Sequence, residues 1–93
     1  MKLPINYAST HFSQRKLARE EYVRRQDGNC HYCKNPLSEE PEESVKAKSI
    51  TPRLYPTHFF KWPVHLHHCR KTGMTIGAVH SHCNAVLWEY EGE

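Results

Sequence analysis

Alternating apolar and polar residues give the clearest secondary-structure signal in the chain, and they run from Trp62 to His68. This alternation predicts a half-buried strand, because successive side chains of a strand point to opposite faces of a sheet. Residues 71–73 predict a turn, and residues 74–79 predict a returning strand. Residues from 80 or 81 to about 90 predict a short helix with Asn84 in its first turns. The segment therefore has the expected order strand, turn, strand, helix.

A second helix is predicted upstream, from about Ser13 to Asp27, with Ser13 as its N-cap. Leu17, Tyr22 and Val23 are expected to form the inward face of this helix. Basic side chains occupy much of the remaining surface of the segment.

Residues 35–61 show no clear hydrophobic period and contain four prolines, so they are interpreted as a long insertion. Near its end, aromatic and basic side chains mix in a way that suits stacking on bases or gripping phosphates. These side chains are Arg53, Tyr55, His58, Phe59, Phe60, Lys61 and Trp62. The simpler alternative, which we favour for Phe59, Phe60 and Trp62, is that they cover a small core.

The composition indicates a thin hydrophobic core. The chain has 93 residues, a hydrophobic content of 38% and a mean hydropathy of -0.81. A single domain of this size has little apolar surface to bury, so we expect it to need a further stabilising element. No stretch resembles a signal peptide or a membrane span, and a cytoplasmic location is therefore expected.

Four side chains have the spacing of a structural zinc site, namely Cys30, Cys33, His80 and Cys83. In a reducing compartment, thiols at this spacing are typical of metal ligands, and three Cys with one His form a normal tetrahedral zinc set. Cys69 and His82 are alternative fourth ligands, and buried free thiols are the alternative to a metal site. Structural zinc contributes about 10–16 kcal/mol of apparent binding free energy in small units, so we expect the metal-free chain to be partly or wholly unfolded.

Three further polar residues, His67, His68 and Asn84, lie outside that tetrahedral set. They form a candidate open site of the kind that holds a catalytic divalent ion and a general base. Because neighbours on a flat strand point to opposite faces, one of the two histidines is expected to bind metal and the other to face the attacking water.

These motifs together resemble the HNH, or ββα-metal, nucleases, and within them the branch of the phage recombination endonuclease VII. Residues 24–33, Arg-Arg-Gln-Asp-Gly-Asn-Cys-His-Tyr-Cys, look like the helix end and first zinc knuckle of that branch, which has Gln-x-Gly-x-Cys-x-x-Cys there. Its second motif is Leu-x-Asp-His-x-His-x-Thr-Gly, followed by Gly-Leu-Leu-Cys-x-x-Cys-Asn. Residues 66–84 resemble this motif and keep its spacing from the Asp-His pair to the Asn. The resemblance covers about two thirds of the chain.

The resemblance implies an α+β fold, a small zinc-stapled ββα-metal (HNH or His-Me finger) domain with an N-terminal helix. Within one domain over residues 1–93, residues 13–27 would be the basic helix and residues 28–34 the first zinc knuckle. Residues 35–61 would be the insertion, and residues 62–90 the ββα-metal motif, with the second knuckle at 80–83.

The resemblance also implies the roles of individual residues. His67 and Asn84 would bind a catalytic divalent ion, either Mg²⁺ or Mn²⁺/Ni²⁺. His68 would be the general base, and Arg70 would clamp a phosphate next to the break. The expected reaction hydrolyses a DNA phosphodiester bond to 5′-phosphate and 3′-hydroxyl ends. This chain departs from the branch at three positions, where His67 replaces Asp, His80 replaces Cys and Arg70 replaces a second His.

Positive charge is concentrated near the N-terminus, since residues 1–34 carry seven Lys or Arg against three acidic residues. A helix with this charge can track a phosphate backbone, although the same groups can be ordinary solvated charges. The candidate nucleic-acid contacts are Arg15, Lys16, Arg19, Arg24, Arg25, Arg53, Lys61 and Lys71.

The expected partner is double-stranded DNA in the cytoplasm of a phage-infected bacterial cell, and a homodimer or a phage or host protein is a further candidate partner. Because the sequence stops at Glu93, we expect no long dimerisation helices, and nicking rather than resolution of branched DNA. Two other functions stay open. One is a catalytically silent, zinc-stabilised module of the same fold that binds DNA or a host protein, and the other is a plain zinc ribbon for protein contacts.

Overall fold

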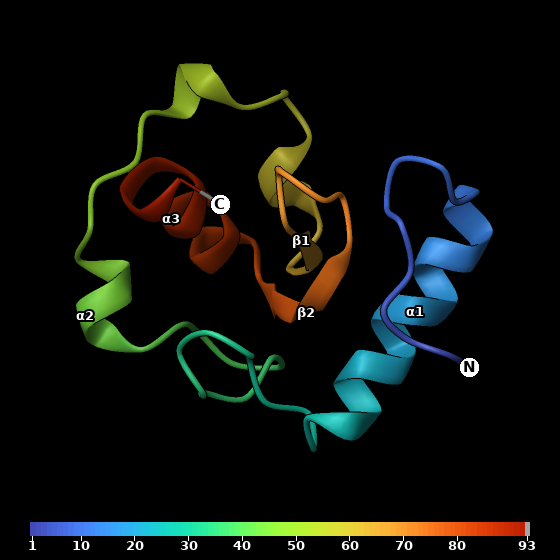
Figure 1. The fold of residues 1–93 in the computed structure, drawn as a ribbon. Coiled ribbons are helices and arrows are strands. Elements are labelled where there is room, and N and C mark those ends of the chain that lie inside the picture. The colour runs from blue at the N-terminus through green and yellow to red at the C-terminus, as the bar shows by residue number, and fades with distance from the viewer. Residues whose placement is uncertain (93) are drawn as a thin grey trace.

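A two-stranded antiparallel sheet lies between two helices in the computed structural model, which describes residues 1–92 (Figure 1). The strands are β1 (Val64–His68) and β2 (Thr75–His80), and the flanking helices are α1 (Phe12–Arg25) and α3 (Ser81–Glu91). Both helices contact the sheet, so the protein is a small α+β domain. Every helix within residues 1–92 is too short or too polar to span a bilayer.

The predicted order of strand, turn, strand and helix is confirmed, with shifted bounds. The second strand runs one residue further than expected and ends at His80. His80 is at the same time the N-cap residue of α3, so the strand passes into the helix without a linker. The helix ends at Gly92, whose φ of 73° is the left-handed conformation that glycine adopts readily at helix ends.

The start of α1 differs from the prediction. The N-cap is His11, whose Nδ1 accepts a hydrogen bond from the backbone N–H of Ser13 at 3.2 Å, so the assignment of Ser13 as N-cap was wrong. An imidazole nitrogen can serve here because the cap needs only an acceptor directed at the free N–H groups of the first turn. A search of the sequence for the usual N-cap residues, Ser, Thr, Asp and Asn, does not find this histidine.

The inward face of α1 also differs in part. Ala18 is fully buried, and Tyr22, one turn later, donates to or accepts from the hydroxyl of Thr75 on β2 at 2.9 Å. Val23 packs against the core as expected, whereas Leu17 is 49% exposed. The contact face is therefore centred on Ala18, and Leu17 lies on the neighbouring face because successive helical residues are about 100° apart.

The expected insertion contains short helical pieces rather than a structureless loop. These are α2 (Glu43–Lys46) and two single turns of 3-10 helix, Pro52–Leu54 and Phe59–Lys61. Figure 1 shows this green to yellow segment passing around α3 before it enters β1. The insertion therefore forms one side of the molecule next to the last helix.

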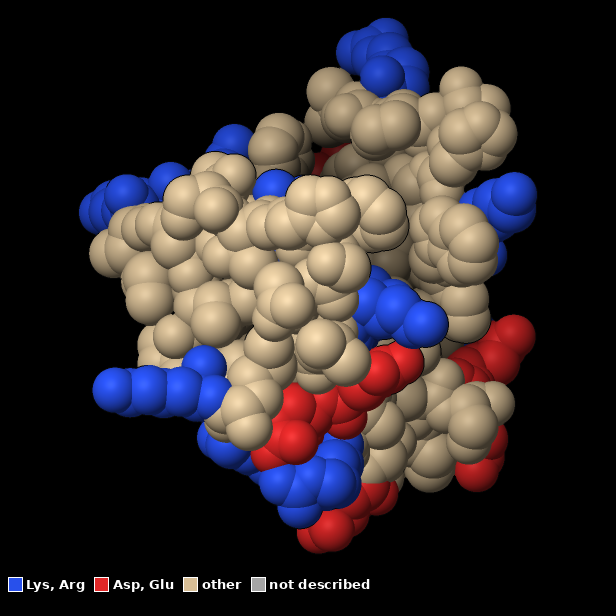
Figure 2. Space-filling model, turned by 90° about the vertical axis from the view of Figure 1, so that its right-hand side faces the viewer, with Lys and Arg blue, Asp and Glu red and all other residues tan. Residues whose placement is uncertain are grey.

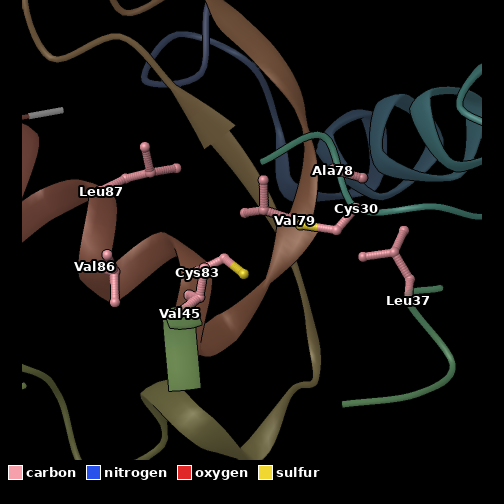
Figure 3. Close-up of a cluster of buried hydrophobic side chains, with 8 residues drawn as sticks. All are labelled: Cys30, Leu37, Val45, Ala78, Val79, Cys83, Val86 and Leu87. Atoms are coloured by element: carbon pink, nitrogen blue, oxygen red, sulfur yellow. The ribbon is translucent and has the colours of Figure 1, made fainter. Parts of the chain in front are cut away.

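The core is small and brings together four parts of the chain (Figure 3). Its buried members come from the loop after α1, from α2, from β2 and from α3. They are Cys30, Leu37, Val45, Ala78, Val79, Cys83, Val86 and Leu87. Two of the predicted zinc ligands, Cys30 and Cys83, are thus part of the core, and the Cys83 sulfur points toward Cys30 in Figure 3.

The aromatic residues before β1 do not close this core as we had favoured. Trp62 is 61% exposed and Phe60 is 40% exposed, so the interpretation of these two as core residues was wrong. Phe59 is half-buried, with its ring 4.6 Å from that of Tyr55. The core instead takes its aliphatic side chains from the loop after α1 and from α2, β2 and α3, which leaves these two rings outside.

Gln26, directly after α1, fastens the loop that carries Cys30 to the edge of β2. Its Nε2 donates to the carbonyl of Ala78 at 2.9 Å, and its Oε1 accepts from the N–H of Ala78 at 2.9 Å. A Cβ on Gly77 would lie 2.9 Å from Gln26 Oε1 and 2.9 Å from Cγ of His31. A glycine is therefore needed at position 77 for this close approach.

We expect Gln26→Ala to lower the free energy of unfolding by about 2 kcal/mol, because the backbone N–H of Ala78 would lose its acceptor, while the Ala78 carbonyl would keep only the N–H of His31. Thermal unfolding of the zinc-loaded protein, followed by circular dichroism, measures the loss. Gln14→Ala is the matched control, since Gln14 is an exposed residue of α1. Equal melting temperatures for the two variants would show that the side-chain amide of Gln26 contributes nothing.

Candidate metal centre and candidate active site

The four predicted zinc ligands converge at the junction between β2, α3 and the loop after α1. The ligand atoms of Cys30, Cys33, His80 and Cys83 all lie within 4.8 Å of one another. His80 Nδ1 is 3.4 Å from Cys33 Sγ and 3.6 Å from Cys83 Sγ. Tetrahedral zinc with ordinary Zn–S and Zn–N bonds separates sulfur from nitrogen by about 3.5 Å, so the spacing fits such an ion.

The ring of His80 is held with Nδ1 toward the thiols. Its Nε2–H donates to the backbone carbonyls of Pro36 and Glu39, each at 3.0 Å. Such an outer hydrogen bond fixes the tautomer and the ring orientation of a metal-binding histidine. The alternative ligand His82 turns away, with Nε2 donating to the carbonyl of Val45 at 3.1 Å. Cys69, the other alternative, lies outside the cluster.

The surroundings of Cys30 favour its thiolate, which is the form that binds zinc. The hydrogen bond from the Cys83 thiol lowers the pKa of Cys30, and the backbone N–H groups of Cys33 and Tyr32 add to this effect. These N–H groups lie 3.5 and 3.4 Å from the Cys30 sulfur. The same sharing, together with burial, raises the pKa of Cys83. The cluster can therefore hold a structural zinc ion.

A separate cavity of about 600 Å³ lies between α1, β1, the end of the insertion and α3. His68, Arg70 and Asn84 all line it, so the structure brings three of the four predicted catalytic residues to one wall. The fourth, His67, is buried at 3% exposure and is not among the lining residues.

The strand pairing is irregular opposite the two adjacent histidines. His67 pairs with Gly77, whereas His68 pairs with Thr75, so one residue of β2 is skipped between them. The extra residue of this bulge, Ile76, belongs to β2. His68 lines the cavity and His67 does not, so the two side chains reach different surroundings. The division of roles between them stays a prediction.

His65 contacts Asn84 in this cavity and was not among the predicted site residues. Asn84 Nδ2 lies 3.1 Å from His65 Nδ1, while His65 Nε2 donates to the carbonyl of Phe59 at 2.8 Å. The bond to Phe59 makes Nδ1 the acceptor of the ring, so Asn84 must donate to it. Burial lowers the pKa of His65, which favours the neutral ring that this arrangement needs.

His68 is stacked on Tyr7, with ring centroids 4.1 Å apart and planes 9° from parallel. The guanidinium of Arg15 lies 4.1 Å from the same tyrosine ring. Tyr7 is placed by its backbone N–H, which donates to the carbonyl of Gly73 at 2.8 Å. Burial, followed by the nearby charge of His67, lowers the pKa of His68. The lowered pKa favours the neutral form of the imidazole.

The predicted nucleic-acid contacts fall into two groups. Arg15, Lys16 and Arg19 line the cavity. Arg24 and Arg25 instead pair with Glu21, which holds the pKa of that carboxyl at about 2.

The remaining candidates, Arg53, Lys61 and Lys71, are exposed and lie outside the cavity wall. On the face shown in Figure 2, basic side chains are dispersed, and acidic ones lie beside them in the lower half. The predicted nucleic-acid contacts that line the cavity therefore all belong to α1.

Comparison of the chain with family models, with curated proteins and with solved structures finds no match. Tyr7 and His65 were missed in the sequence because neither has a motif of its own, and both act through contacts with residues far along the chain or across a strand-helix junction.

Proposed function

We propose that this protein is a metal-dependent endonuclease of the HNH type that hydrolyses phosphodiester bonds of DNA. The observation that carries the proposal is one cavity wall on which a neutral imidazole, His68, lies with Asn84 and several basic side chains. An imidazole can take the proton of the attacking water, cations can bind the phosphate, and an amide oxygen can bind a divalent ion, so the three groups suit phosphodiester hydrolysis.

The arrangement around the candidate zinc site supports a ββα-metal fold. His68 ends β1, and Asn84 lies in the first turn of α3, directly after the ligand Cys83. A zinc ion bound by Cys83 and His80 would fix the start of α3 relative to β2. The metal would thereby hold Asn84 at a constant position opposite His68.

The residues of this chain would divide the reaction as follows. His68 removes a proton from a water molecule, whose oxygen forms a bond to phosphorus while the bond to the 3′ oxygen breaks. The leaving oxygen takes up a proton from solvent, which gives 5′-phosphate and 3′-hydroxyl ends. Arg70 and Arg15 hold the phosphate through charge-assisted hydrogen bonds.

A divalent ion is also expected, and the donors at Asn84 fit one. The hydrogen bond to His65 uses the amide nitrogen of Asn84 and leaves Oδ1 as a hard oxygen ligand. The family resemblance implies His67 as an imidazole ligand, but His67 is buried and does not line the cavity, so Asn84 is the member of this pair that the cavity offers to an ion. When bound, Mg²⁺, Mn²⁺ or Ni²⁺ would stabilise the negative charge that develops on the phosphate and on the leaving oxygen.

A plasmid relaxation assay tests the proposal. Zinc-loaded protein is incubated with supercoiled DNA, either without a further ion or with Mg²⁺, Mn²⁺ or Ni²⁺. We expect open-circular DNA only when the second ion is added. Intact plasmid under every ion, together with a gel shift, would replace the enzyme by a binding module.

That binding module is the second candidate function, and two observations favour it. His67 is buried and does not line the cavity. The guanidinium of Arg70 lies 4.0 Å from the Trp88 ring, a contact that a phosphate clamp would have to share. A module that only binds DNA or a host protein catalyses no reaction. It therefore needs neither a metal ligand at His67 nor a free phosphate clamp at Arg70.

The contact between His65 and Asn84 gives a sharper test of the nuclease. We expect His65→Ala to raise the divalent-ion concentration for half-maximal nicking by about tenfold, because Asn84 would lose the partner that orients its amide. His65→Asn should restore part of the affinity, since its Oδ1 offers an acceptor in place of Nδ1. An unchanged ion requirement in His65→Ala would show that the contact does not orient Asn84.

A further inference from the structure

We infer that the cavity binds a single unstacked base, and that the substrate is single-stranded or locally unpaired DNA. This inference names the substrate class of the proposed nuclease and rests on that proposal for the reaction, but its binding step can be measured separately. It departs from the double-stranded substrate expected from the sequence.

Aromatic side chains form much of the cavity wall. They come from the N-terminal segment, from the insertion and from α3, and are Tyr7, Phe12, Tyr55, Phe59, Trp62 and Trp88. Several remain strongly exposed, with Phe12 at 72% and Trp88 at 41%. Large rings that stay in water around one concave site are typical of a binding surface.

Three of these aromatic rings, Tyr55, Phe59 and Trp88, are held in fixed positions by contacts with one another and with the backbone. The Tyr55 hydroxyl donates to the carbonyl of Ala85 at 3.1 Å, and the Tyr55 ring lies 4.6 Å from Phe59 and 6.3 Å from Trp88. Rings that are already ordered lose little side-chain entropy on binding a flat ligand. The wall is therefore suited to stacking against a base.

Charge identifies the ligand as a nucleotide rather than an uncharged aromatic compound. Four cations line the cavity, namely Arg15, Lys16, Arg19 and Arg70, and none of its lining residues is acidic. Two of these guanidinium groups lie against aromatic rings, Arg15 on Tyr7 at 4.1 Å and Arg70 on Trp88 at 4.0 Å. Such a wall complements a ligand that carries a flat apolar group next to an anion, as a nucleotide does.

Size and base accessibility favour an unpaired strand. A cavity of about 600 Å³ lies within the range of roughly 300–1,000 Å³ that accepts ligands as large as a nucleotide. In a duplex the base faces are covered by their stacked neighbours, so only a base outside the stack can meet these rings. Single-strand binding proteins combine aromatic platforms with a basic groove in the same way.

Fluorescence anisotropy on zinc-loaded protein without a further divalent ion tests this inference. Three labelled probes of about 12 nucleotides are compared, within the usual site size for single strands. They are oligo-dT, a blunt duplex, and an abasic strand that has the phosphates without the bases. We expect oligo-dT to bind about tenfold more tightly than either of the others. The bases of the duplex are already stacked on one another and the abasic strand has none, so neither can stack a base on the aromatic side chains of the cavity.

Variants on one helix locate the binding. Trp88→Ala should weaken oligo-dT binding about tenfold and leave the abasic strand unchanged. Tyr90→Ala is the matched control, since Tyr90 is also on α3 but donates to the Ser49 carbonyl outside the cavity. Trp62→Ala, at a site 61% exposed, gives a second test should Trp88→Ala fail to fold.

The outcomes separate the inference from the nuclease proposal. Equal affinity for oligo-dT and the abasic strand, or tighter binding of the duplex, overturns the inference even if plasmid nicking is observed. Preferential binding of oligo-dT that is lost in Trp88→Ala supports the inference even if no nicking is detected.

Discussion

Chelation of zinc is expected to convert the folded protein into a largely unfolded chain. Cys30 and Cys83 belong to the small hydrophobic core, so a zinc ion held by the cluster would lie inside the region that stabilises the fold. Structural zinc contributes about 10–16 kcal/mol of apparent binding free energy, whereas native domains are stable by only about 5–15 kcal/mol in total. Circular dichroism and the zinc content of the protein before and after chelation measure the change.

Two cysteine variants provide the control for this loss of structure. Cys83→Ser should give a chain without zinc and without a cooperative thermal transition, because the cluster would lose a ligand and the core a buried thiol. Cys69→Ser should keep one zinc ion per chain, since Cys69 lies outside the cluster. A metal-free protein that still melts cooperatively at the same temperature would contradict the stabilising role of the site.

Replacement of His68 by Ala is expected to lower the rate of plasmid nicking by at least about a hundredfold, as removal of a general base does in other enzymes. The rate is measured at saturating divalent ion. The loss should appear with unchanged zinc content, because His68 is not part of the metal cluster.

The control for His68 is another imidazole of this chain. His31 is exposed and does not line the cavity, so His31→Ala should nick at the rate of the unmodified protein. Circular dichroism of both variants verifies that they are folded. Nicking by His68→Ala at the unmodified rate would exclude His68 as the base.

Much of the fold follows from local patterns in the sequence. The strands and the last helix were predictable because alternation and helical runs reflect which side chains face the core. The convergence of Cys30, Cys33, His80 and Cys83 was predictable because zinc coordination requires pairs of ligands at short spacing. Alternation, helical periodicity and ligand spacing each involve residues that are close in the sequence, so they can be recognised without the tertiary structure.

The parts that could not be predicted depend on contacts between distant segments. The bulge at His67 and His68 arises from the pairing of two strands, and no property of the strand alone reveals it. The bond between His65 and Asn84 joins a strand to a helix. The outward position of Trp62 depends on which distant segments supply the core, and the apolar character of one residue does not predict that.

The chain between α2 and β1 has a consequence for how this protein can diversify. Its two ends are fixed, because Val45 of α2 lies in the core and β1 pairs with β2. Extending a flexible loop between fixed ends changes stability little, since doubling its length costs only about 0.6 kcal/mol. The same segment supplies Tyr55 and Phe59 to the cavity wall. We therefore expect that exchange of this loop, by evolution or in the laboratory, changes what the cavity accepts while the buried core residues stay the same.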